Sequence, residues 1–144
     1  MPSGVRVISI HASLALVFLS AALPLAGCGR DDDVTATQAV AERFFAAVQS
    51  GDGEQACAQL SPDTRAELES REQRACREAV TELQLEGGRV ARVEVYVTNA
   101  RAELSSGEVA FLDQGEEGWR LSAVGCTAED GKPADRPYDC ELEA

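Results

Sequence analysis

The cysteines are the residues of this chain whose number and spacing indicate the most definite chemistry. There are five of them, and four remain when Cys28, at the end of an apolar segment, is set aside. An even number of cysteines in an exported domain is typical of disulfides. Three pairings are possible. We predict Cys57–Cys76 and Cys126–Cys140, because each pair closes a short loop and a loop of about 15 residues contributes about 3 kcal/mol. The alternative for Cys57 and Cys76 is two buried free thiols.

Other reactive side chains form no recognisable set. The sequence has no C-x-x-C pair, and its one histidine, His11, precedes Cys28. The consecutive acids Asp31, Asp32 and Asp33 are interpreted as a solvated charge run and not as a metal site. No Ser-His-Asp set, glycine-rich phosphate loop or cofactor motif is visible. We therefore expect no catalytic residue, no metal and no cofactor.

The first thirty residues have the composition of an export signal. Arg6 is the one cation before Cys28, and the segment Val7–Ala22 is apolar apart from three serines and a histidine. A short positive region, an apolar region and a cleavage site with small residues describe such a signal. Two alternatives are a secretory signal that releases the protein and an uncleaved membrane helix over Val7–Ala26, since a span needs about 20 apolar residues. Pro24 would interrupt the end of that helix.

The end of this segment carries a more specific pattern. Leu25-Ala26-Gly27-Cys28 resembles the lipobox of bacterial lipoproteins. In that family the cysteine thiol receives a diacylglycerol, and cleavage leaves this cysteine as the first residue of the mature protein. The resemblance implies a signal peptide over 1–27 and a protein anchored by lipid at the extracytoplasmic face of the cell membrane. Two acyl chains are sufficient for stable anchoring.

Beyond Cys28 we expect two further parts. Residues 28–35 would comprise the lipidated cysteine and a flexible acidic tether, and residues 36–144 a single globular domain. The whole chain has 25 acidic and 13 basic residues, with a formal net charge of −12. Such an acidic surface repels nucleic acid and anionic lipid headgroups. We therefore expect no nucleic-acid partner.

The pattern of apolar residues predicts helices first and strands afterwards. A first helix from Thr35 or Thr37 to about Gln49 has an apolar stripe that includes Phe44 and Phe45. After the stop at Ser50–Gly53 we expect a short helix containing Cys57. Two more helices are predicted over 62–70, with Ser61 as N-cap, and over 71–83.

Alternation with a period of two begins after Gly88 and predicts an antiparallel sheet. Four short strands, around 93–98, 100–105, 109–112 and 119–124, are separated by turns, which indicates a meander. Helices followed by such a sheet are typical of an α+β fold with the helices on one face. The tail, residues 127–144, has few large apolar residues, so we expect the Cys126–Cys140 bond to pin it.

The order of these elements resembles the nuclear-transport-factor-2-like superfamily, and in particular small actinobacterial lipoproteins with that fold. The turn Ser50-Gly51-Asp52 and the later Gly118-Trp119-Arg120-Leu121 match motifs of the superfamily, within a match over about 37–125. The resemblance implies a cone-shaped, cystatin-like curved sheet of four strands around the first helix, enclosing a cavity. The residues that we expect to line this cavity are Phe44, Phe45, Trp119 and Tyr96.

Enzymes of that superfamily commonly use an Asp–His pair or a tyrosine with acids. No histidine follows Cys28, and Tyr96 would line the cone only if the strand register were reversed. We therefore expect a non-enzymatic envelope module that binds a small apolar ligand or an envelope protein. The alternatives are a structural component that dimerises through the outer sheet face, and a carboxylate-dependent enzyme of the isomerase or cyclase type.

Overall fold

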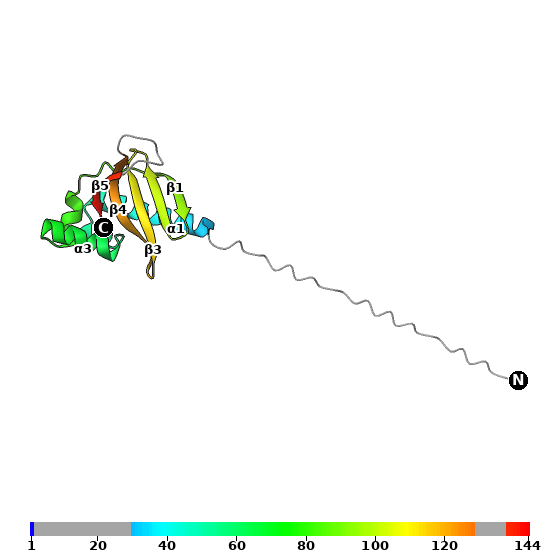
Figure 1. Cartoon of the computed structure of the whole chain (residues 1–144). Helices are drawn as coiled ribbons and strands as arrows, with labels where there is room; N and C mark the ends of the chain where they lie inside the picture. The colour runs from blue at the N-terminus through cyan, green and yellow to red at the C-terminus, as the bar shows by residue number, and fades with distance from the viewer. Residues whose placement is uncertain (2–29, 129–137) are drawn as a thin grey trace.

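The structure is a computed structural model that describes Met1, residues 30–128 and residues 138–144. The predicted signal peptide and Cys28 otherwise lie outside the described residues, as do residues 129–137 of the tail. The first half of the domain is helical (Figure 1). Its elements are α1 (Arg30–Ser50), α2 (Gly53–Cys57), α3 (Pro62–Glu72), α4 (Cys76–Ala79) and the short 3-10 helix η1 (Val80–Glu82).

The second half is an open antiparallel sheet in which each strand pairs with the next one along the chain. The strands are β1 (Val90–Tyr96), β2 (Asn99–Leu104), β3 (Val109–Gly115), β4 (Gly118–Ala128) and β5 (Tyr138–Glu143). The predicted α+β class with N-terminal helices and an antiparallel meander is confirmed. The predicted number of strands is wrong, because the sheet has five strands and not four.

The fifth strand comes from the tail, which we had expected to be held only by its disulfide. Cys140 lies directly opposite Cys126, and Leu142 lies opposite Val124. Leu142 and Val124 are both fully buried in the main core. Burial of Leu142 and the covalent bond to Cys126 therefore stabilise a strand that the composition of the tail does not suggest.

Helix α1 begins at Arg30, so the prediction of a tether through residue 35 is wrong for the described residues. Asp31, Asp32 and Asp33 occupy the first turn, where the positive end of the helix dipole favours negative charge. Asp33 also accepts a hydrogen bond at Oδ1 from Nε1 of Trp119, over 3.1 Å. The hydrogen bond to Trp119 thus anchors the first turn of α1 to the sheet, although the three consecutive acids in this turn predicted a solvated segment.

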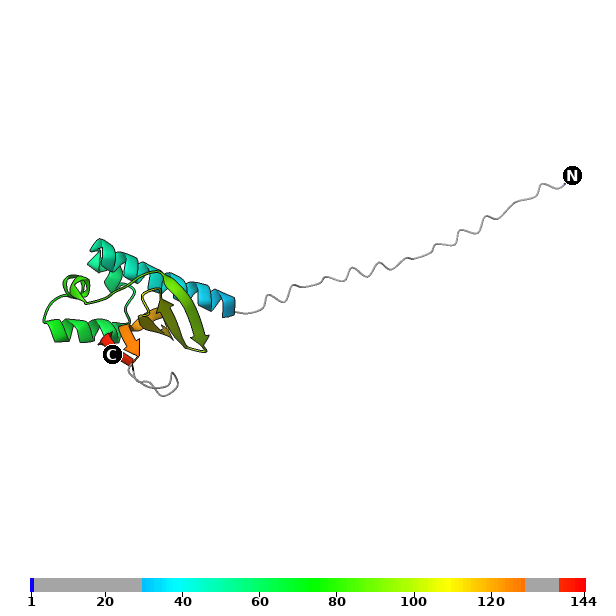
Figure 2. The same cartoon turned by 90° about the horizontal axis from the view of Figure 1, so that it is seen from above.

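The main core lies between the helices and one face of the sheet. In the two views of Figures 1 and 2, α1 runs across this face, while α3 lies beside the end formed by β4 and β5. Phe44 and Phe45 of α1 are buried and pack edge to face with their ring centroids 5.1 Å apart. On the outer face, Phe111 and Tyr138 pack together beside the second disulfide.

The helices after α2 match the sequence prediction at the start of α3 but differ from it after residue 70. The predicted N-cap is confirmed, because Oγ of Ser61 accepts a hydrogen bond from the backbone N–H of Thr64 at 3.1 Å. The single helix predicted over 71–83 is wrong. Gln73 has a φ of 53°, in the left-handed region, and caps the C-terminus of α3. The chain therefore turns before Cys76 and starts α4 in a new direction.

Candidate functional site

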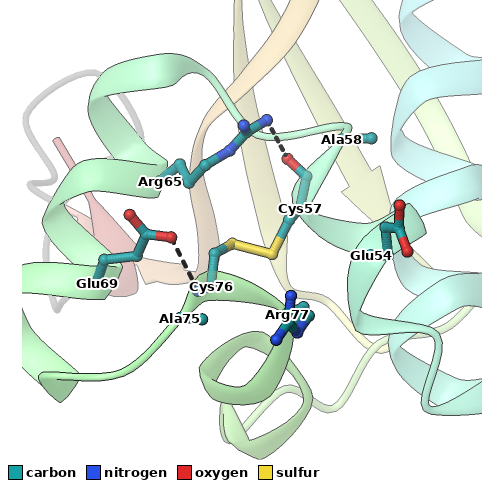
Figure 3. Close-up of a pocket in the computed structure, with 8 residues that line it drawn as sticks. All are labelled: Glu54, Cys57, Ala58, Arg65, Glu69, Ala75, Cys76 and Arg77. Atoms are coloured by element: carbon teal, nitrogen blue, oxygen red, sulfur yellow. Dashed lines mark hydrogen bonds between the residues drawn. A yellow bond between two sulfur atoms is a disulfide. The ribbon is translucent and has the colours of Figure 1, made fainter.

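One candidate site in the described part of the chain is a cleft beside the first disulfide (Figure 3). It has a volume of about 350 Å³ and lies where α2, α3 and α4 meet. The residues that line it are Glu54, Cys57, Ala58, Arg65, Glu69, Ala75, Cys76 and Arg77. A volume of this size is at the lower end of the range for small-molecule sites.

Both predicted disulfides are present, so the alternative of two buried free thiols is wrong. Cys57, at the end of α2, is bonded to Cys76, at the start of α4, with their Cα atoms 6.1 Å apart. Cys126 of β4 is bonded to Cys140 of β5. The first bond therefore forms the floor of the cleft and joins α2 to α4. The second bond joins the edge strand β5 to β4.

The walls of the cleft require a glycine at the start of α2. Asp52 caps this helix, since its side chain accepts a hydrogen bond from Gln55 N–H at 3.0 Å. A Cβ atom on the next residue, Gly53, would lie 1.8 Å from the carbonyl oxygen of Arg77. The backbones of α2 and α4 are thus in direct contact, and a hydrogen atom is the only side chain that fits between them.

Two side chains of α3 hold the disulfide from the other side. Arg65 donates a hydrogen bond from Nη2 to the carbonyl oxygen of Cys57 over 2.9 Å. Glu69, one helical turn further, accepts at Oε1 from the backbone N–H of Cys76 over 3.0 Å. Because the two side chains are four residues apart, they lie on one face of α3 and each bonds one cysteine. Figure 3 shows both on one side of the sulfur–sulfur bond and Glu54 on the other.

The cleft is polar, and its lining includes both positively and negatively charged side chains. Arg65 and Arg77 present guanidinium groups, which bind carboxylates and phosphates through paired donors. Glu54 and Glu69 present carboxylates, which accept from ammonium or hydroxyl groups. The side chain of Arg77 is 67% exposed and lies 3.8 Å from Glu78, so it is accessible to a ligand. The arrangement therefore suits a small polar molecule that carries a negative group and a donor group.

The residues predicted to line an apolar cavity lie elsewhere. Phe44, Phe45 and Trp119 are buried in the core and do not line the cleft. Tyr96 is 56% exposed and alternates with the buried Val95, so it lies on the outer sheet face. Its hydroxyl donates to Oε2 of Glu94 over 3.1 Å, and this hydrogen bond raises the pKa of Tyr96. The expectation that these four residues surround one cavity is therefore wrong for Tyr96.

A second pocket, of about 420 Å³, lies beside the turn between β3 and β4. Its charged lining residues are Asp63, Asp113, Glu116, Glu117 and Arg120. Within residues 30–128 and 138–144, no three or more histidine, cysteine, aspartate or glutamate side chains are grouped as metal ligands would be. The acids around this pocket thus form a charged surface.

A buried carboxylate in the described part of the chain has a structural role that the sequence did not predict. Glu108 is buried and accepts hydrogen bonds from the backbone N–H groups of Glu86, at 3.0 Å, and Gly87, at 2.7 Å. Buried backbone donors require partners, and these donors belong to the segment that leads from η1 to β1. Both carboxylate oxygens are therefore engaged in holding this connection.

Just outside the cleft, an ion pair fixes the loop between α3 and α4. Arg74 donates to both carboxylate oxygens of Glu82, each over 2.8 Å. The hydrogen bonds and the charge of Arg74 hold the pKa of Glu82 below its usual value. The pair is exposed to solvent, so it orders the loop and makes a small contribution to stability.

We expect the variant Arg74→Gln to raise the pKa of Glu82 toward its ordinary value, because the charged partner is lost. A depressed folded-state pKa contributes stability above the unfolded pKa, which is lost as the pH falls through the folded value. The variant should therefore be less stable than the wild type at neutral pH and equal to it in acid. Carboxyl NMR titration measures the pKa, with Arg77→Gln as control. An unchanged pKa in Arg74→Gln would contradict the ion pair.

Comparisons with known proteins identified no similar protein. No model of a protein family, no curated protein and no solved structure matches the chain. Among the helices that the structure describes, none combines the length and the apolar character needed to cross a membrane.

Proposed function

We propose that this chain is a membrane-anchored extracytoplasmic lipoprotein whose head is a non-enzymatic binding module of the cell envelope. The anchor would be a diacylglycerol on Cys28, at the end of Leu25-Ala26-Gly27-Cys28. One observation carries the proposal: the four cysteines of the folded domain are used in two disulfides. Stable disulfides form in oxidising compartments outside the cytosol, and this pairing leaves Cys28 for the lipid.

We further propose that the head belongs to the nuclear-transport-factor-2-like superfamily. Its long first helix lies across one face of an antiparallel meander, and the Ser50–Asp52 turn leads into a short second helix that packs against the first. The fold does not determine the chemistry, whereas the charged groups of the cleft would select a ligand. The two arginines and two glutamates there favour a small polar or zwitterionic ligand over the apolar one first expected.

The anchor is tested by expressing the full chain in a bacterium with a lipoprotein pathway and measuring the mass of its N-terminal peptide. We expect a peptide that begins at Cys28 and carries the mass of a diacylglycerol. The variant Cys28→Ser should lack this mass and leave the membrane fraction. A wild-type protein that begins at another residue, or that carries no acyl mass, would overturn the proposal.

The binding role is tested by native mass spectrometry of the protein purified from the envelope. We expect a bound small molecule in the wild type and its loss in Arg77→Gln, because that guanidinium is exposed at the cleft. Arg92→Gln is the matched control, since Arg92 is equally exposed but lies on β1. Loss of the bound mass in both variants, or in neither, would contradict binding in this cleft.

A further inference from the structure

Two neighbouring apolar side chains project from the turn between β1 and β2. Tyr96 is 56% exposed and Val97 is 88% exposed. Apart from Met1, they are the large hydrophobic residues that stand exposed in the described part of the chain. Val97 also has a φ of 52°, in the left-handed region that a β-branched residue rarely adopts. The turn therefore presents valine where glycine or asparagine would be the ordinary choice.

This turn lies at the same end of the domain as the start of α1. Arg30, the first residue of α1, donates from Nη2 to the carbonyl oxygen of Val95 over 3.4 Å. Figures 1 and 2 both show the first turn of α1 beside the end of β1. Cys28 precedes Arg30 by two residues, so their Cα atoms are at most about 7 Å apart. The short covalent link from Cys28 to Arg30 and the hydrogen bond from Arg30 to Val95 thus keep the proposed lipid anchor near the exposed pair.

We propose that the turn Tyr96–Val97 inserts into the headgroup region of the membrane to which Cys28 is anchored. This inference rests on the proposed function, because the anchor brings the turn to the lipid surface. A tyrosine suits that depth, since its ring is apolar while its polar hydroxyl, which donates to Glu94, stays at the headgroup level. With the lipid on Cys28, the head then has a second contact and a fixed orientation.

The orientation places the cleft away from the membrane. Helix α1 has 21 residues, and at 1.5 Å per residue it is roughly 30 Å long. Its first turn lies at the membrane end, whereas its last residue, Ser50, leads directly into α2, which contributes to the cleft. The two ends of one helix thus separate the surface that contacts lipid from the site that contacts a soluble ligand.

The surrounding charges select the kind of lipid. Asp31 and Asp32 lie in the first turn of α1, and the turn with Glu116 and Glu117 is at the same end of the sheet, because Asn99 pairs with Asp113. Arg30 lies at this end as well, and Arg120 is paired with Glu117 there. The four acids outnumber these two arginines, so anionic headgroups would repel this end of the domain. The partner is therefore a zwitterionic lipid surface, such as phosphatidylcholine or phosphatidylethanolamine.

The test uses the full lipidated protein with Tyr96→Trp, reconstituted in phosphatidylcholine vesicles that carry brominated acyl chains. The native Trp119 is buried and supplies a constant background. The matched control is Ser106→Trp, at the exposed turn between β2 and β3 on the opposite end of the sheet. We expect bromine to reduce the added emission of Tyr96→Trp roughly twofold and that of the control hardly at all, because an interfacial indole lies near the acyl chains.

The outcomes separate this inference from the proposed function. Intact mass is read first, and a protein without acyl mass would overturn the anchor and the inference together. A lipidated protein in which Tyr96→Trp is quenched no more than Ser106→Trp would overturn the inference and leave the anchor standing. Anionic vesicles should give weaker quenching than phosphatidylcholine, and stronger quenching there would overturn the assignment to zwitterionic lipid.

Discussion

The variant Gly53→Ala should lower the free energy of unfolding by about 3 kcal/mol, the upper part of the usual range for overpacking. The added methyl group would lie 1.8 Å from the carbonyl oxygen of Arg77. That oxygen belongs to the backbone of α4 and cannot rotate away, so α2 and α4 must separate. Chemical denaturation followed by circular dichroism measures the change in stability.

The matched control for this variant is Gly115→Ala. A Cβ at Gly115 would meet no atom within 4 Å, and the φ of this residue lies outside the left-handed region. We therefore expect a change within about 0.5 kcal/mol, as for most surface substitutions. If the two variants had equal stability, the close approach of α2 to α4 would be disproved.

Removal of the first disulfide should lower the free energy of unfolding by about as much as Gly53→Ala does. Cys57 and Cys76 are 19 residues apart, and a loop of this length contributes about 3 kcal/mol in the chain-entropy model. We expect the double variant Cys57→Ala/Cys76→Ala to lose that stability, because the unfolded chain regains its freedom. The variant should also lose any molecule bound in the cleft, since the disulfide is its floor.

Removal of the second disulfide is the control for removal of the first. Cys126 and Cys140 are 14 residues apart, so Cys126→Ala/Cys140→Ala should lose about the same stability in the chain-entropy model. This pair staples β5 to β4 and does not line the cleft, so binding there should persist. Equal loss of the bound molecule in both double variants would show that stability, and not the local floor of the cleft, determines binding.

Several parts of the fold could be predicted from local sequence. Ser61 before Pro62 predicts an N-cap, and the structure has that cap. Both disulfide pairings followed from the preference for short loops. The alternation after Gly88 predicted the meander, because one buried face imposes a period of two along each strand. In each case the signal is a local residue pattern, a short loop between paired residues or a regular repeat.

Two of the incorrect predictions share a different cause. The start of α1 and the fifth strand depend on contacts between distant segments, Asp33 with Trp119 and Leu142 with Val124. The composition of these segments, an acid run and a polar tail, indicated disorder. Contacts of this kind override local propensity, and nothing in a single sequence reports which distant partner will supply them.

By itself the sequence determined the class of fold, the order of helices and strands, the two covalent bonds and the expectation of an export signal ending at Cys28. Only the tertiary structure decided where ligands could bind. Glu54, Arg65, Glu69 and Arg77 form no motif, and they meet because α2 and α4 touch at Gly53 while α3 bonds both cysteines. The physical reason is that periodicity reports which face of an element is buried, whereas a cleft arises from the angles at which elements pack.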